Sequence, residues 1–206
     1  MKVGNWAMAV ANSRFRNKLI AGVVLLVAIL LFFPIFFAVI ESRKGLVMND
    51  WLLSNIGPHD FSVPVFIIIW SMTLMFFIRS YNQPQLFLTV VWCVVLLSLV
   101  RMTTIYLVAL DPPAGLIKLQ DPLTSLTYGG RNIFITKDLF FSGHTSNMLV
   151  LAFCFEKRSD KWLAFIGAIA VGIMVLFQHV HYSIDVIAAF IITFLLVKVG
   201  KKLAAY

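Results

Sequence analysis

Long uncharged apolar runs constrain the fold of this chain more than any other feature. Residues 19–40 carry no charged side chain. A helix needs about 20 apolar residues to cross the hydrocarbon core of a bilayer, so this run is long enough to span it. Further candidate spans lie at residues 61–78, 86–110, 139–155, 162–177 and 186–197. The sequence therefore predicts an all-α polytopic membrane protein, with six transmembrane helices forming one domain over residues 1–206.

The composition supports the same class of protein. Hydrophobic residues make up 61% of the chain and charged residues 13%. A soluble domain carries about 25% charged residues, and a globule of this size cannot bury so many apolar side chains. The composition also excludes a disordered chain and a secreted domain held by disulfides. Cys93 and Cys154 both fall inside predicted helices and are expected to be packing residues.

The N-terminal segment leaves two interpretations open. The apolar run at residues 19–40 is longer than that of a secretory signal, and no small-residue cleavage site follows it, so a retained helix is expected. Residues 1–18 combine apolar and basic side chains, namely Trp6, Met8, Val10, Arg14, Arg16 and Lys18. This segment is either an interfacial amphipathic helix or a plain basic flank.

The distribution of charge predicts the orientation in the membrane. One face would hold residues 1–18, 79–85, 156–161 and 198–206, which contain most of the 17 basic residues. By the positive-inside rule both termini are then cytoplasmic, and the opposite loops are exoplasmic or periplasmic. The net charge of +8 is thereby explained by topology. No basic and aromatic recognition segment lies outside the membrane flanks, so nucleic acid is not an expected partner.

Arg101 is an ionised residue at membrane depth, where charged side chains are costly and usually functional. It lies near the outer end of its predicted helix. A guanidinium matches phosphate oxygens, which favours phosphate binding. The alternatives are that Arg101 reaches toward the membrane surface or pairs with a structural aspartate.

Two polar segments lie on the same predicted face as Arg101. In the first, Ser142 is a candidate N-cap, Gly143 allows close approach to the backbone, and His144 stands where helix N–H groups favour an anion. In the second, His181 and Asp185 are four residues apart, so the carboxylate can orient the ring. The neighbouring His179 is either part of the site or a polar boundary residue.

These residue types together predict the transfer of a phosphoryl group. One histidine attacks phosphorus, the other protonates the leaving oxygen, and an arginine and a helix start stabilise charge. A catalytic metal is the competing chemistry. No HExxH or similar compact ligand set is present, so neither a metal nor a cofactor is expected.

Two of these segments resemble a known family. Residues 142–144 (Ser-Gly-His) and the His181-x-x-x-Asp185 spacing resemble the last two signature motifs of the type-2 phosphatidic acid phosphatase superfamily. That superfamily has a six-helix membrane core. Its phosphatase branch has a Lys-x6-Arg-Pro motif, which is absent here, and a Ser-Arg pair where this chain has Met174 and Val175.

The sphingomyelin synthase branch of that superfamily resembles this chain more closely. Its Asp-x3-Ser-Gly-His-Thr pattern matches Asp138 and residues 142–145. Its His-x-His-Tyr-(Thr/Ser)-(Ile/Val)-Asp pattern matches residues 179–185 at every specified position. Its Arg-x2-Thr-x-Tyr-x3-Leu-x2-Pro stretch matches Arg101, Thr104, Tyr106, Leu110 and Pro113.

The resemblance implies an enzyme that exchanges phospholipid head-groups. His181 would take a phospho-head-group from a phospholipid donor, and His144 would act as acid and then as base for a ceramide-like lipid acceptor. Asp138 would join this network or cap a helix. The small size of the chain suits a bacterial relative, with the site on the periplasmic side of the inner membrane. The residues expected to bind substrate are Arg101, Tyr106, Asp138, Ser142, Gly143, His179 and Tyr182.

Two other functions remain open at this point. With water as the acceptor, the same site would make a lipid phosphatase or a phospholipase C-like hydrolase. A non-catalytic lipid binder, scramblase or transporter could keep the same fold. Trp92, Tyr106 and Tyr182 form either a cage for a quaternary ammonium head-group or a set of interface aromatics.

Overall fold

The computed structural model describes residues 4–119 and 135–206. In these ranges the chain is helical, without a named strand, and one isolated bridge joins Leu46 to Leu110. This confirms the all-α class. The helices are α1 (Gly4–Ala11), α2 (Ser13–Ser42), α3 (Trp51–Asn55), α4 (Ser62–Asn82), α5 (Pro84–Leu107), α7 (Gly143–Cys154), α8 (Arg158–Phe177) and α9 (Ser183–Ala204).

Five of the described helices, α2, α4, α5, α8 and α9, are long and apolar enough to cross a membrane. They correspond to five of the six predicted spans. The third span ends earlier than predicted, at Leu107 rather than at residue 110. The last is longer, because α9 begins at Ser183 and takes Asp185 into its first turn.

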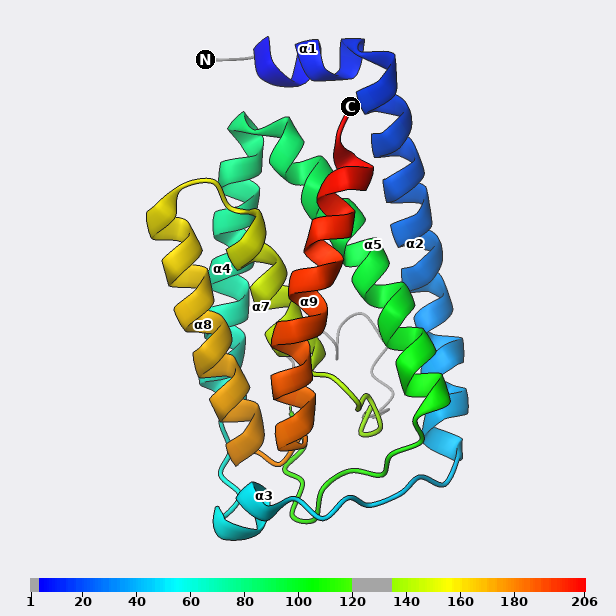
Figure 1. Ribbon diagram of the computed structural model, residues 1–206, viewed down its shortest axis with the longest axis vertical. Helices are drawn as coiled ribbons and strands as arrows, with labels where there is room; N and C mark the ends of the chain where they lie inside the picture. The colour runs from blue at the N-terminus through cyan, green and yellow to red at the C-terminus, as the bar shows by residue number, and fades with distance from the viewer. Residues whose placement is uncertain (1–3, 120–134) are drawn as a thin grey trace.

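The fourth predicted span, residues 139–155, corresponds to the short helix α7. Its 12 residues make a helix about 18 Å long, which cannot cross a bilayer by itself. The predicted start at residue 139 is wrong because Phe140 has a φ of 96° and Ser142 caps the helix. Figure 1 shows α7 starting in mid-bundle and leading the chain back toward the termini. A sixth membrane crossing remains a prediction.

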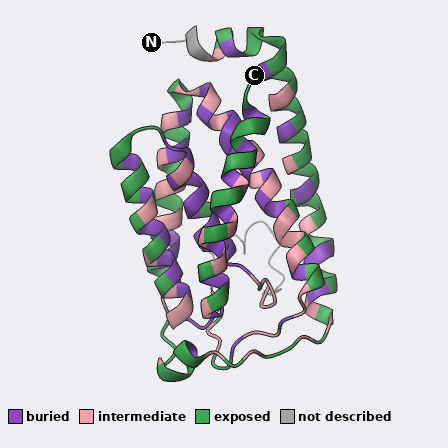
Figure 2. Cartoon of the chain, in the orientation of Figure 1, coloured by how far each residue is buried: buried purple, intermediate pink, exposed green. Residues whose placement is uncertain are grey.

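Helix α7 forms the centre of the bundle and packs against α4, α5, α8 and α9. Most of its residues are buried, and they belong to the main apolar core. The outer helices bury one face and expose large apolar side chains on the other (Figure 2), such as Leu31, which is 73% exposed. Contiguous apolar surface of this kind suits lipid as the surrounding solvent.

The interior helices approach one another closely. Cys93 on α5 and Cys154 on α7 are buried free thiols whose Sγ atoms lie 3.9 Å apart. On α9, a Cβ at Gly200 would lie only 2.5 Å from Cys93 Sγ. The two cysteines are therefore buried packing residues, and the sequence did not predict that they are neighbours.

Both termini lie at one end of the bundle, and α3 with the long loops lies at the other (Figure 1). We call these the terminus end and the loop end. Residues Gly4–Ala11 form the separate helix α1, which crosses the terminus end and donates a hydrogen bond from Trp6 Nε1 to the Ser80 carbonyl at 3.1 Å. Whether α1 is interfacial, and which end faces the cytoplasm, remain predictions.

Candidate active site

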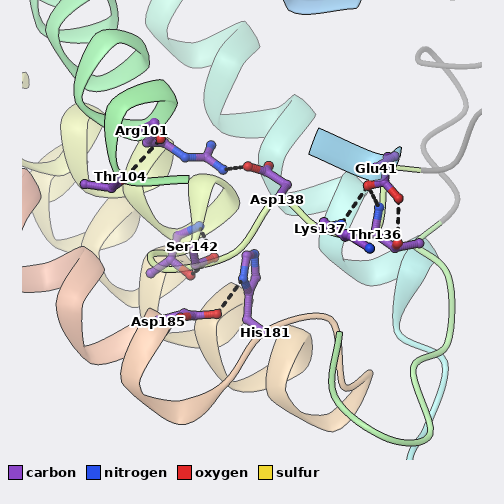
Figure 3. Close-up of polar contacts among 10 residues, drawn as sticks. Glu41, Arg101, Thr104, Thr136, Lys137, Asp138, Ser142, His181 and Asp185 are labelled. Carbon is purple, nitrogen blue, oxygen red and sulfur yellow. Dashed lines mark hydrogen bonds and ion pairs between the residues drawn. The ribbon is translucent and has the colours of Figure 1, made fainter. Parts of the chain in front are cut away.

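The motif segments meet in the half of the bundle nearer the loop end (Figure 3). The Ser142 amide donates a hydrogen bond to the Asp185 carbonyl at 3.1 Å, which ties the start of α7 to the start of α9. The rings of His144 and His181 then lie side by side, with their centroids 6.4 Å apart. A histidine predicted at a helix start and one predicted between two helices are thus brought to one place.

His181 and Asp185 form a fully buried pair. His181 Nδ1 lies 3.3 Å from Asp185 Oδ2, and the same oxygen accepts a hydrogen bond from the Tyr182 amide at 3.1 Å. Asp185 is therefore both a cap of α9 and the group that orients the ring. Because Nδ1 is held by the carboxylate, Nε2 is the ring nitrogen left for chemistry.

His144 lies in the first turn of α7, whose N-terminus Ser142 caps. The Ser142 hydroxyl accepts hydrogen bonds from the Thr145 amide at 3.3 Å and from the Thr145 hydroxyl at 3.0 Å. His144 is half-buried between the ring of Phe66, 6.2 Å away, and that of His181. The first N–H groups of a helix lack partners within it, so this end of α7 favours a negative charge beside His144.

Arg101 reaches the same place from α5. Its guanidinium forms an ion pair with Asp138, the structural pairing that the sequence left open. The guanidinium also lies directly against Gly143, where any Cβ would overlap Arg101 Nη1. Glycine at position 143 thus lets the guanidinium lie against the backbone, and a larger residue would have to displace it. The sequence suggested only close approach of a substrate. Arg101 Nε is buried and has no hydrogen-bond partner among the described residues.

Glu41, at the end of α2, holds the segment that carries Asp138. Its carboxylate accepts hydrogen bonds from the amide and hydroxyl of Thr136 at 2.6 and 2.9 Å, and from the Lys137 amide at 2.7 Å (Figure 3). Sequence reasoning did not give Glu41 a role at the site. Its only signal was an acidic residue at the end of an apolar run, which carries no information about a partner so far along the chain.

Asp50, in the loop before α3, is a second residue that the sequence did not indicate. Its carboxylate caps α3 and also accepts hydrogen bonds from the amide and hydroxyl of Ser183 at 2.6 and 2.9 Å. Burial opposes ionisation of Asp50, but the bonds from Ser183 and from the Leu53 and Leu52 amides outweigh it and lower the pKa of this carboxyl. An ionised carboxylate thus holds the first residue of α9.

The remaining polar residues of the 178–182 loop bond to other loops at this end. Gln178 Nε2 donates to Ser62 Oγ at 2.8 Å and to Asp60 Oδ1 at 3.2 Å. The buried Tyr182 hydroxyl donates to the Asp111 carbonyl at 2.8 Å. The ring nitrogens of His179 lie against the carbonyls of Ala114 and Ile56. All three side chains thus have protein partners, and the predicted contact of His179 and Tyr182 with substrate stays a prediction.

The structure does not bring together Trp92, Tyr106 and Tyr182, for which a head-group cage was one of two interpretations. Tyr106 is 65% exposed, and its described contact is a hydrogen bond that its carbonyl accepts from Arg43 at 2.7 Å. Trp92 packs beside Gly22 of α2 and the cluster of Phe15 and Leu88 near the terminus end. Within residues 4–119 and 135–206, no group of three histidine, cysteine or acidic residues could hold a metal ion.

Residues 137–202 match the family model described as PAP2 superfamily C-terminal. The matched region includes Asp138, Ser142, His144, His181 and Asp185, and it leaves Arg101 and helices α1 to α5 outside. The match supports the type-2 phosphatidic acid phosphatase superfamily, which consists typically of lipid phosphatases and related enzymes. No curated protein and no solved structure matches the chain significantly. The long apolar helices and this match together support a multi-pass membrane protein. The match also suggests phosphatase-type or phosphotransferase-type lipid chemistry.

Proposed function

We propose that this protein is a membrane-embedded phosphotransferase that moves a phospho-head-group from a glycerophospholipid to a lipid hydroxyl. The observation that carries the proposal is the pairing of His144 with a His181 ring that Asp185 orients, at a centroid distance of 6.4 Å. Two imidazoles this close can act on opposite sides of one phosphorus atom.

In the first step, His181 Nε2 attacks the phosphorus of the donor lipid. The N–P bond forms while the P–O bond to diacylglycerol breaks, and protonated His144 gives its proton to the departing oxygen. Asp185 accepts the Nδ1 hydrogen bond and stabilises the positive ring that develops.

In the second step, the acceptor hydroxyl replaces diacylglycerol. Neutral His144 takes the proton from this hydroxyl, whose oxygen attacks phosphorus as the bond to His181 breaks. The site then returns to its starting protonation, so the cycle balances without a cofactor or a metal.

Arg101 and the N-terminus of α7 would stabilise the charge on the phosphoryl oxygens. The guanidinium already lies at this helix end, against Gly143, and its Nε atom has no described hydrogen-bond partner. Preorganised donors aimed at developing charge are commonly worth a factor of roughly 10²–10³ in rate. Asp138 would hold the guanidinium between turnovers.

The three motifs that resemble the sphingomyelin synthase branch favour transfer over hydrolysis, with a ceramide-like acceptor. Hydrolysis is the second candidate, because water reaching the phosphohistidine would give a lipid phosphatase or a phospholipase C-like enzyme with the same residues. On the topology predicted from charge, the reaction would take place on the exoplasmic or periplasmic side.

The test uses purified protein in lipid nanodiscs with a phospholipid labelled at the head-group phosphate. Choline, ethanolamine and inositol donors are compared, each with and without ceramide. Transfer predicts labelled phospho-ceramide product and labelled protein that is stable in base and labile in acid. His181→Asn should carry no label. If only water-soluble label appears, with or without ceramide, the reaction is hydrolysis and the transfer proposal is overturned. If turnover is unchanged in both His144→Asn and His181→Asn, this site is not an enzyme active site.

A further inference from the structure

His179 lies where three segments of the loop end meet. Its ring is 5% exposed and belongs to the loop between α8 and α9. Nδ1 lies 2.6 Å from the Ala114 carbonyl oxygen, and Nε2 lies 3.0 Å from the Ile56 carbonyl oxygen. One side chain thus joins the loop that precedes His181 to the segments after α3 and after α5.

The two partners of this ring can only accept hydrogen bonds. A neutral imidazole carries one N–H, so it can satisfy one carbonyl while its other nitrogen turns a lone pair toward the second oxygen. The imidazolium carries two N–H groups and satisfies both. Both contacts are hydrogen bonds only when the ring is doubly protonated, because a carbonyl facing a lone pair has no donor there.

The backbone around this ring is shaped to hold it. His179 has a φ of 53°, a left-handed conformation that is uncommon for residues other than glycine. Gly115 has a φ of 79°, and a Cβ there would lie 3.3 Å from His179 Nδ1 and 3.4 Å from Pro58 Cγ. Glycine at this turn leaves room for the ring between the two loops.

Two backbone hydrogen bonds flank the ring and follow the same connections. The His59 amide donates to the Phe177 carbonyl at 2.8 Å, and the Ile117 amide donates to the Gln178 carbonyl at 3.0 Å. The residues just before His179 are therefore bonded on one side to the segment after α3 and on the other to the segment after α5. Loss of the ring contacts would loosen both connections together.

We propose that His179 is a cationic positioning residue. Its two ring N–H groups donate hydrogen bonds to the Ile56 and Ala114 carbonyls, a pair of contacts that we call the clasp, and the clasp fixes His181 beside Asp185. The protonation of the ring follows from the geometry alone, whereas its effect on turnover rests on the proposed function. His179 acts through His181 and does not touch the reacting atoms.

The first measurement is nitrogen NMR of protein labelled at histidine and held in nanodiscs without substrate. The His179 resonances, assigned by their absence in His179→Asn, should show two protonated ring nitrogens at neutral pH. A neutral His179 ring under these conditions overturns the proposal. Because no substrate is present, this result does not depend on the proposed reaction.

The second measurement is amide hydrogen exchange in His179→Asn, with His59→Asn as the matched control. Asparagine tolerates the left-handed backbone, so this variant removes the ring without adding strain at φ. Exchange at the Ile117 amide should rise by about tenfold or more in His179→Asn and stay unchanged in the control. Exchange at the His59 amide, read in His179→Asn and in the unchanged protein, should rise with it. Unchanged exchange in both variants overturns the clasp.

Turnover then separates positioning from chemistry. His179→Asn should lower kcat by about tenfold and leave KM nearly constant. A mainly raised KM would instead indicate direct substrate contact and overturn the positioning role. If His181→Asn retains full turnover while the ring of His179 is cationic, the proposed function fails and the clasp stands.

Discussion

The two ends of the bundle are held together in different ways. At the terminus end, polar contacts join the ends of helices, as in the ion pair of Arg79 with Asp160 and the bond from Lys18 to the Leu203 carbonyl at 2.8 Å. At the loop end, polar side chains from the loops and from the end of α2 hold the starts of α7 and α9. Asp50 bonds to Ser183 and Glu41 holds the segment before Asp138.

This difference shows that polar side chains have different structural roles at the two ends. Loops outside a helix must satisfy their backbone groups with whatever is near, because they have no regular internal pattern. At the loop end those partners also fix the histidine ring positions. A site held within a fraction of an ångström needs such support, whereas the terminus end needs only to close the helix ends.

The largest effect is expected at the centre of the loop end. His181→Asn removes the nucleophilic ring while its amide can still donate to Asp185, so the fold should persist. We expect turnover to fall by roughly 10⁴–10⁶-fold, as for other catalytic nucleophiles. The measurement is labelled head-group transfer, with circular dichroism as the check on folding. His59→Asn, an exposed histidine at the same end, should retain activity, and equal losses in the two variants would contradict the assignment.

The next effect tests the contact between Arg101 and Gly143. In Gly143→Ala the new Cβ must displace the guanidinium, and misplacement by about 1 Å can cost about 10²-fold in rate. The control is Gly57→Ala, whose Cβ would lie an ordinary 3.8 Å from His59 Cε1. Turnover and Tm are measured for both. Full activity of Gly143→Ala would show that the position of Arg101 is unimportant.

Two helix-capping residues, one at each end of the bundle, allow a direct comparison of the ends. Asp50 caps α3 and holds Ser183, while Asn12 caps α2 at the terminus end through the Arg14 and Phe15 amides. Replacing either by alanine should cost about 1–2 kcal/mol of unfolding free energy. Only Asp50→Ala should also lower turnover, because it releases the start of α9. Equal activity in the two variants would contradict the difference between the ends.

The lowered pKa of Asp50 adds a dependence on pH. Since the folded pKa lies below the ordinary value of 3.8, its bonds contribute full stability above that value and lose it as the pH falls through the lowered pKa. Asp50→Asn has no carboxyl to titrate and should lack this acid loss. Unfolding measured from neutral pH down to acid, in both proteins, provides the check; parallel curves would exclude a role for this carboxyl.

The smallest effect belongs to the terminus end. Arg79 is 39% exposed in its side chain, and Asp160 keeps the Ser159 hydroxyl as a donor at 3.2 Å without it. Arg79→Gln should therefore cost about 0–1 kcal/mol of stability and leave turnover unchanged. The measurement is Tm together with head-group transfer. A clear loss of turnover would mean that the two ends are coupled.

The local features of the site followed from sequence, and its connections did not. Helical spacing predicted that Asp185 reaches His181, and the Ser-Gly-His segment predicted a cap at Ser142. Both depend on residues within four positions. The roles of Glu41 and Asp50 depend on partners far along the chain, for which no local pattern exists.

The sequence by itself determined the class of protein, five of the long helices and the three motif segments, because apolar length and helical period are local properties. Only the tertiary structure decided that α7 is short and central, that Arg101 lies against Gly143, and that the His179 ring joins two loops. These features arise from packing between helices and from backbone groups that must find partners. Such partners are fixed only when the whole bundle has closed.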